Sequence, residues 1–250
     1  MSKALITWGG WDGHEPDKVA ALFAGWLREA GMAVEVSDSL SCFDDPKTLA
    51  TMDLIVPVWT MSRIGKEQAL NACAAVASGT GIAGCHGGMC DAFRENVDWQ
   101  FMTGAQWVAH PGNDGVEYGV RIVSDDPLVA GVGDFVVKTE QYYLHVDPAV
   151  KVHAVCDFPV VEGPHAVNGP VAMPVVFTKG YGAGRVYYNA LGHQKAVIDH
   201  GPAAELMRRG LLWAARRAGL EGYVTSDAGP HVKVLCRPEV APDLANRLAA

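Results

Sequence analysis

Short apolar strands alternate with helical segments and glycine-rich turns over residues 3–85, and this alternation restricts the fold more than any other feature of the chain. Residues 3–7 are typical of a buried strand. After Pro16 apolar residues recur at helical spacing until Gly31, which is placed to end the helix. The same reasoning predicts strands over 33–36, 53–58 and 81–84 and an alanine-rich helix over 65–78. Strands that alternate with helices pair in parallel through right-handed crossovers, so the sequence predicts an α/β protein with a mainly parallel sheet.

The pattern changes near residue 116, where short β-branched runs replace the helices. Runs over 118–123, 134–138 and 150–155 are separated by turn-forming Asp-Pro segments, which predicts an antiparallel β excursion at the edge of the sheet. Two further runs, 171–178 and 185–190, flank a glycine-bearing connection and predict a hairpin.

Residues 180–184 superficially resemble a dinucleotide-binding loop, but they join two strands instead of opening a helix. Phosphate binding at a helix N-terminus is therefore not available there, and we expect no nucleotide cofactor.

An amphipathic helix is predicted over 202–218. We expect a single domain over 1–220 with a β insertion at about 116–178, followed by a C-terminal extension over 221–250.

The composition is that of an ordinary globular protein, with 49% hydrophobic and 19% charged residues. A net charge of −8 provides no general positive field, so nucleic acid and membrane surfaces are not expected as partners. No apolar stretch approaches the roughly 18 residues of a spanning helix, and no cleavable leader is recognisable, so a cytoplasmic protein is expected. The six cysteines contain no CxxC pair and are interpreted as free thiols. A homodimer is expected only from its general frequency among proteins.

Four metal-binding side chains fall where predicted strands end or loops begin, namely His14, His86, Glu140 and His193. Ligands of an open parallel sheet bind outside the carboxyl ends of its strands, so we expect these groups to meet there. Imidazole nitrogens and a carboxylate oxygen suit Zn²⁺, Fe²⁺ or Mn²⁺, and an open coordination position would make the site catalytic. Taken singly, each histidine is more often a hydrogen-bonded loop or core residue than a ligand, and it is the occurrence of four such groups at one sheet edge that favours a metal site. We interpret the histidines without this context as structural or solvated: His145, His153, His165, His200 and His231.

The glycine-rich segment 84–88 has the form of a nucleophile elbow, a strained strand-to-helix turn that pushes its central side chain into a site. The central residue is His86, whereas Cys85 would point back toward the sheet. A tight turn that needs glycine only for its backbone, with an idle His86, is the alternative interpretation.

Several aromatic side chains lie near the predicted strand ends, where they could stack on sugar rings or fill the core: Trp8, Trp11, Trp59, Tyr142 and Tyr143. Asp91 and Arg94 are interpreted as an exposed pair on a helix.

The chain resembles the ThuA-like, or trehalose-utilisation, family over residues 4–217. The motifs that carry the resemblance are the turn 84–88 with Phe93, the segments 101–104, His110-Pro111, 140–143 and 177–193, and Leu212-Trp213-Ala214. The resemblance implies a flavodoxin-like fold of the class I glutamine amidotransferase type, with a mainly parallel sheet sandwiched by helices. Amidotransferases place a cysteine at the centre of the elbow, where this chain has His86, so glutamine hydrolysis is not expected.

The resemblance further implies carbohydrate catabolism, with a keto-disaccharide or keto-glycoside as substrate. Our leading hypothesis is a sugar-processing hydrolase, lyase or isomerase with His86, Glu140 and His193 as catalytic residues. His14, His86, Glu140 and His193 would bind a divalent metal, with zinc the first choice, and Glu140 would act as ligand or general base. The predicted substrate-binding residues are Trp11, Asp12, Tyr142 and His110. One alternative is a metal-free hydrolase with Cys85 or Cys90 as nucleophile and His193 as base, and another is a non-catalytic sugar-binding module.

Overall fold

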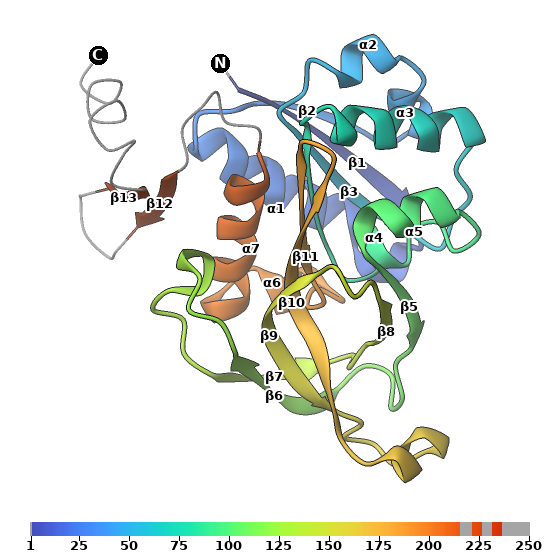
Figure 1. Ribbon diagram of the computed structural model, residues 1–250, viewed down its shortest axis with the longest axis vertical. Coiled ribbons are helices and arrows are strands. Elements are labelled where there is room, and N and C mark those ends of the chain that lie inside the picture. The colour runs from blue at the N-terminus through green and yellow to red at the C-terminus, as the bar shows by residue number, and fades with distance from the viewer. Residues whose placement is uncertain (1, 216–221, 227–231, 237–250) are drawn as a thin grey trace.

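The computed structural model describes residues 2–215, 222–226 and 232–236, and within them one mixed sheet of nine strands forms the centre of the molecule (Figure 1). In spatial order the strands are β2 (Ala33–Ser37), β1 (Lys3–Gly10), β3 (Leu54–Thr60), β4 (Gly81–Cys85), β11 (Gly184–Asn189), β10 (Val171–Tyr181), β9 (Lys151–Phe158), β6 (Val116–Ile122) and β7 (Phe135–Thr139). From β2 to β11 neighbouring strands pair in parallel. From β11 to β7 they pair antiparallel, so the predicted excursion and the predicted hairpin are both confirmed.

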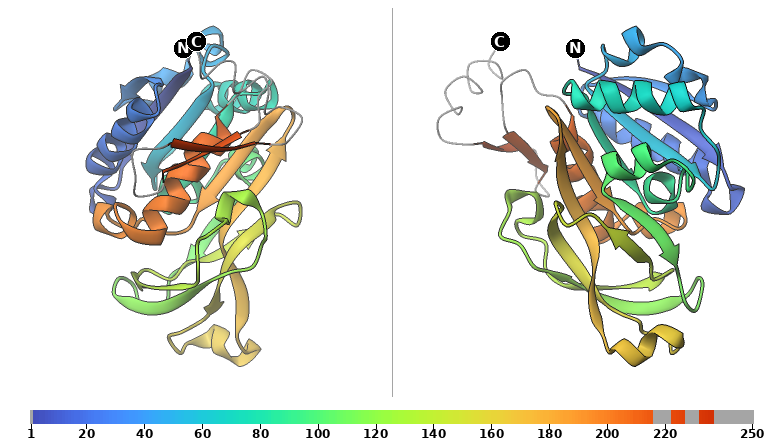
Figure 2. Two further views of the ribbon diagram at one scale, coloured as in Figure 1. Left: turned by 90° about the vertical axis from the view of Figure 1, so that its left-hand side faces the viewer. Right: turned by 45° about the vertical axis from the view of Figure 1, so that its right-hand side comes forward.

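Helices cover both faces of the parallel half of the sheet (Figures 1 and 2). On one face α1 (Pro16–Glu29) packs beside α7 (Gly201–Ala214), and on the other lie α3 (Lys66–Ala77) and α5 (Val97–Thr103). The apolar face of α1 is buried against the sheet, as its spacing predicts. The α/β architecture inferred from the sequence is therefore the observed one.

The shorter elements lie mostly in the connections between these strands and helices. They are η1 (Asp12–His14), η2 (Leu40–Phe43), α2 (Pro46–Leu49), α4 (Gly87–Cys90), η3 (Pro127–Val129), η4 (Pro164–Asn168) and α6 (Lys195–Ile198). Two pairs of strands form separate small sheets: β5 (Ala105–Ala109) with β8 (Tyr143–Val146), and β12 (Gly222–Ser226) with β13 (Val232–Cys236). The second pair falls within the predicted C-terminal extension. Helix α7 ends at Ala214, and residues 216–218 of the predicted helix lie outside the described residues.

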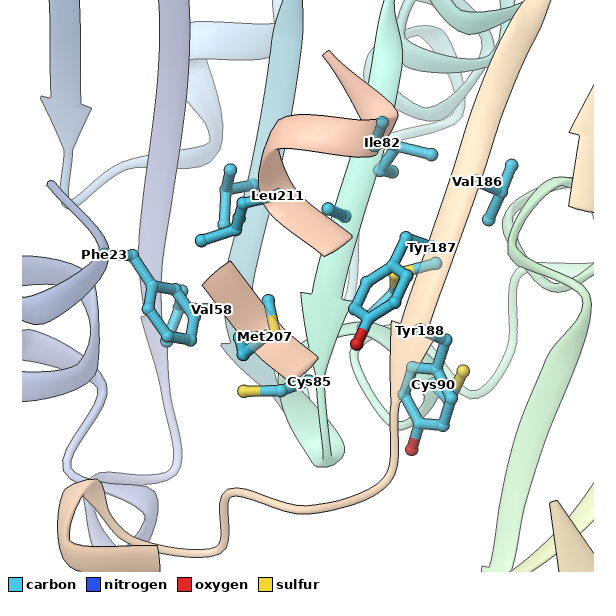
Figure 3. Packing of buried hydrophobic residues seen from close by; sticks show 14 of the residues in the cluster. Phe23, Val58, Ile82, Cys85, Cys90, Val186, Tyr187, Tyr188, Met207 and Leu211 are labelled. Carbon is cyan, nitrogen blue, oxygen red and sulfur yellow. The ribbon is translucent and has the colours of Figure 1, made fainter. Parts of the chain in front are cut away.

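The core between α7 and the sheet depends on close contact of the helix with β11 (Figure 3). A Cβ at Gly210 would lie 2.1 Å from the ring of Tyr187, so only glycine lets the helix approach this buried tyrosine. The Tyr187 hydroxyl donates to the Leu206 carbonyl at 2.7 Å, which satisfies its one buried polar group. This packing fixes β11 beside β4 and thereby fixes the loops that leave the carboxyl ends of both strands.

Among the helices of the described residues, none combines the length and the apolar character needed to cross a membrane.

Candidate metal and catalytic site

The segment 84–88 forms the predicted elbow between β4 and α4. His86 has φ 48° and ψ −138°, a conformation that costs a non-glycine residue about 1–3 kcal/mol. Two positions of the turn require glycine: a Cβ at Gly84 would lie 2.6 Å from that of Met89, and a Cβ at Gly87 would lie 2.7 Å from Cε1 of His14. The His86 amide donates to the Asn189 carbonyl on β11 at 2.7 Å, which anchors the turn. The elbow therefore holds the His86 imidazole in a fixed place at the sheet edge.

The other three predicted ligands come from separate connections. His14 ends η1, directly after β1, and His193 lies between β11 and α6. Glu140 follows β7, and its carbonyl accepts a hydrogen bond of 3.0 Å from the buried Tyr118 hydroxyl. Because Tyr118 is on β6, the antiparallel excursion carries Glu140 back to the edge formed by the parallel strands.

The four side chains meet in one cluster, and one ligand atom from each lies within 4.8 Å of all the others. Oε2 of Glu140 is 3.4 Å from Nε2 of His86 and 3.3 Å from Nδ1 of His193. All four residues are buried. The convergence expected from the sequence is thus present in the structure.

Two buried nitrogens of this cluster, Nε2 of His86 and Nδ1 of His193, have no hydrogen-bond partner within the described part of the chain. Both lie close to Oε2 of Glu140, at 3.4 Å and 3.3 Å, without a well-formed hydrogen bond to it. An unpartnered buried nitrogen is costly, and nitrogens that face a carboxylate oxygen in this way are oriented as ligands of a common cation.

The opposite ring nitrogens of two histidines are held by hydroxyl groups. Nδ1 of His14 is 3.0 Å from Oγ1 of Thr60, and Nδ1 of His86 is 2.8 Å from Oη of Tyr142. When Nδ1–H donates to these oxygens, Nε2 keeps its lone pair for the centre of the cluster. This arrangement of an oriented imidazole is typical of metal ligands.

The electrostatics of the cluster leave it ready to bind a cation at neutral pH. Burial lowers the pKa of His14 to about 4 and that of His86 well below its ordinary value, so both rings are neutral. Burial opposes ionisation of Glu140, but contact with His193 outweighs it and the pKa of Glu140 is lowered. Burial also opposes protonation of His193, but the Glu140 carboxylate raises its pKa. A metal would therefore meet an ionised carboxylate and two neutral imidazoles, and would compete with a proton mainly at His193.

A cavity of about 420 Å³ opens above this cluster. Of the predicted substrate-binding residues, Trp11, Tyr142 and His110 line it, and Nε2 of His110 lies 3.8 Å from Oε1 of Glu140. Asp12 has an exposed side chain and does not belong to the cavity wall. His86 lies beneath the wall with 1% of its surface exposed, so a ligand in the cavity would reach the cluster through its other members.

Several residues of the wall were not predicted from the sequence to belong to a site: Met61, Asp91, Arg94, Trp107, Asn113 and Asp114. The interpretation of Asp91 and Arg94 as an exposed helix pair is wrong, because α4 ends at Cys90 and Asp91 is only 3% exposed. The one feature of the sequence that could have indicated their place in the site is that both residues come shortly after the elbow helix. The burial of Asp91 depends on segments distant in sequence and could not be inferred from spacing.

The two cysteines considered as nucleophiles point into the core, as expected for Cys85 (Figure 3). Burial raises the pKa of Cys85 to about 12 and that of Cys90 well above its ordinary value. A thiolate nucleophile therefore has no support from the structure. His153 bonds to the hydroxyls of Ser124 and Thr178 inside the β excursion, in agreement with its interpretation as structural. His231 lies outside the described residues.

Comparison with known proteins gives a family and a fold. The family model described as ThuA, trehalose utilisation, matches residues 3–214. A ThuA-like protein from Bacteroides uniformis is similar with a TM-score of 0.68 and 16% identity, over 86% of this chain and 93% of that one. A ThuA-like protein from Parabacteroides merdae has a TM-score of 0.64 and 18% identity, over 86% and 89%. A β-galactosidase from Bacillus circulans has a TM-score of 0.55 and 12% identity, over 91% of this chain and 34% of that enzyme. No curated protein matches the chain in sequence.

Proposed function

Because the chain belongs to the ThuA, trehalose utilisation, family, we propose that it processes an oxidised sugar, such as a keto sugar or keto-glycoside, at a divalent metal. The metal would be held by His14, His86, Glu140 and His193. The family indicates a role related to carbohydrate utilisation. The metal and the oxidised substrate are our proposal, and the observation that carries them is the pair of unpartnered buried nitrogens turned toward the Glu140 carboxylate.

The donor set fits a divalent transition metal. Three imidazole nitrogens and one carboxylate oxygen are ligands that Zn²⁺, Fe²⁺ and Mn²⁺ accept, and zinc is our first choice. Thr60 and Tyr142 supply the outer hydrogen bonds that such ligands require. The cavity leaves room on one side of the cluster for a substrate.

When bound, the ion would polarise a carbonyl or hydroxyl oxygen of the sugar and lower the pKa of a coordinated water. Glu140 carries out the proton transfer. Its Oε2 is directed to the histidines, whereas its Oε1 faces His110, and at Oε1 it would accept a proton from the substrate. Trp11 and Tyr142 line the cavity, where their aromatic rings would contact a bound sugar.

A non-catalytic sugar-binding module on the same fold is the competing function, because a fold does not by itself fix an activity. The Glu140→Gln variant separates the two. An enzyme loses turnover of a keto-glycoside in this variant, because glutamine preserves the shape of the side chain without its basicity. A binding module shows no turnover in either form.

The metal is tested by elemental analysis of the protein as purified. We expect one transition metal ion per chain and its loss in the His86→Ala variant. His200→Ala is the matched control, because His200 is exposed and hydrogen-bonded to Asp199 outside the cluster. A preparation that turns over substrate without a bound metal would contradict the metal part of the proposal.

A further inference from the structure

A second polar group faces the same cavity outside the cluster of histidines, and it consists of Arg94 and Asp91. Nε and Nη2 of Arg94 lie 2.5 Å and 2.9 Å from the two carboxylate oxygens of Asp91. The carboxylate is buried, whereas the arginine side chain is 43% exposed. The backbone is fixed as well, because the Asp91 carbonyl accepts from the Met61 amide at 2.8 Å and the Arg94 carbonyl from the Gln100 side chain at 2.7 Å.

The guanidinium group of Arg94 also packs against an aromatic ring, that of Trp107. Its carbon lies 4.4 Å from the centre of the Trp107 ring, and that ring packs near His110 and Tyr142, at 5.2 Å and 6.1 Å between centroids. A guanidinium has five N–H donors in a fixed plane, and the bonds to Asp91 use only Nε and one hydrogen of Nη2. Nη1 and the second hydrogen of Nη2 are then available to a ligand in the cavity.

The charges of the wall decide which ligand suits these donors. Among the lining residues, Asp91, Asp114 and Glu140 are carboxylates, and Arg94 is the cationic residue apart from the histidines. Asp91 neutralises Arg94 through its two-point contact. A substrate carboxylate placed at the guanidinium would meet Asp91 directly, which disfavours an acidic sugar.

We propose that Arg94 determines substrate specificity by donating hydrogen bonds to adjacent hydroxyl or carbonyl oxygens of a neutral sugar, and that Asp91 is the positioning residue that holds and neutralises it. This inference rests on the proposed function, because it places the sugar in the cavity above the metal cluster. It assigns a sugar-contacting role to residues outside that cluster, and it selects neutral over acidic sugars as the substrate class.

Methyl glucoside and methyl glucuronide test the proposal, because they share a ring and differ by a carboxylate. Their affinities are measured by titration calorimetry on the protein after incubation with Zn²⁺. We expect the wild type to prefer methyl glucoside by about tenfold or more. Arg94→Ala should weaken methyl glucoside binding by about 10- to 100-fold, because hydrogen bonds from a charged donor are lost. Arg94→Lys should not restore it, because an ammonium cannot reproduce the planar fork.

The Asp91→Asn variant tests whether Asp91 acts on sugar preference, a quantity that would not change if Asp91 only supported the fold. It keeps the shape of the side chain but leaves the guanidinium charge uncompensated, so the preference should shift toward methyl glucuronide by about tenfold. Arg63→Ala is the matched control, because Arg63 is exposed, pairs with the exposed Glu95 and lies outside the cavity wall. It should change neither affinity.

Three results would overturn the inference: a wild type that prefers the glucuronide or binds neither sugar, equal effects of Arg94→Ala and Arg63→Ala, or an unchanged sugar preference in Asp91→Asn. Metal content, measured on the same samples, keeps this test separate from the proposed function. A protein that holds its metal but fails these binding tests refutes only the role of Arg94. A protein that shows the expected sugar preferences without binding any metal refutes only the metal.

Discussion

The hydroxyl of Tyr142 offers the sharpest test of the metal cluster. Its oxygen lies 2.8 Å from Nδ1 of His86, and the two rings pack with 3.8 Å between their centroids. Burial raises the pKa of Tyr142 well above its ordinary value, so the group is a neutral hydroxyl at neutral pH. Tyr142→Phe removes the hydrogen bond and keeps the ring.

The size of the effect follows from the burial of both partners. Tyr142 is 4% exposed and His86 is 1% exposed, so water cannot replace the lost hydroxyl. A buried group left without its partner costs about 1–3 kcal/mol, and about 1.4 kcal/mol corresponds to tenfold in affinity. The loss of a hydrogen bond that orients a metal ligand typically weakens metal binding by about 10- to 100-fold. We therefore expect zinc to bind Tyr142→Phe about 10- to 100-fold more weakly.

Competition against a chromophoric chelator at neutral pH measures this affinity. The adjacent Tyr143→Phe is the matched control, because its ring packs on Phe158 and His165 and does not line the cavity. It should bind zinc like the wild type. If both variants lose the same affinity, or neither loses any, the Tyr142 hydroxyl does not orient a metal-binding imidazole.

Burial lowers the pKa of His153 to about 4, so the unfolded chain takes up a proton near its ordinary pKa of 6.5 while the folded protein does not. The free energy of unfolding is therefore full above pH 6.5 and falls by about 2–3 kcal/mol on acidification to about pH 4.5. Urea unfolding of the His153→Gln variant should show a shallower dependence of this free energy on pH. The same pH dependence in the variant and the wild type would contradict the burial of a neutral His153. Gly87→Ala would place a Cβ 2.7 Å from the His14 ring, so we expect zinc affinity to fall about tenfold, and an unchanged chelator titration would show that the ring tolerates the methyl group. Iodoacetamide should label the partly exposed Cys42 before Cys85 in the native protein, and mass spectrometry measures this order. Labelling of Cys42 should leave turnover unchanged. Loss of turnover in proportion to the labelling of Cys85 would instead support the mechanism with a cysteine nucleophile.

Much of the site could be predicted because it lies at the edge of the parallel strands. His14 and His86 lie in the connections that follow predicted strands, and the carboxyl ends of parallel strands meet at one edge. His193 follows β11, which pairs with β4 in parallel. The run of glycines around His86 indicates a tight turn there, although the contact that requires glycine at position 87 is made by His14, which is distant in sequence.

Glu140 and the cavity wall required more than local rules. Glu140 comes from the antiparallel part of the sheet, and its place depends on how that part folds back over the edge. The pair of Asp91 and Arg94 has the spacing of an ordinary surface ion pair, whereas the contact of Arg94 with Trp107 depends on the small sheet of β5 and β8. No pattern in the sequence encodes that contact.

The sequence by itself determined the alternation of strands and helices, the strained turn at His86 and the kinds of side chain available for metal binding, because these depend on periodicity, backbone sterics and ligand chemistry. The tertiary structure decided which lone pairs face one another, which imidazoles stay neutral and which carboxylates are buried. Those properties depend on distances between segments far apart in the chain and on exclusion of water, and both arise only when the core is packed.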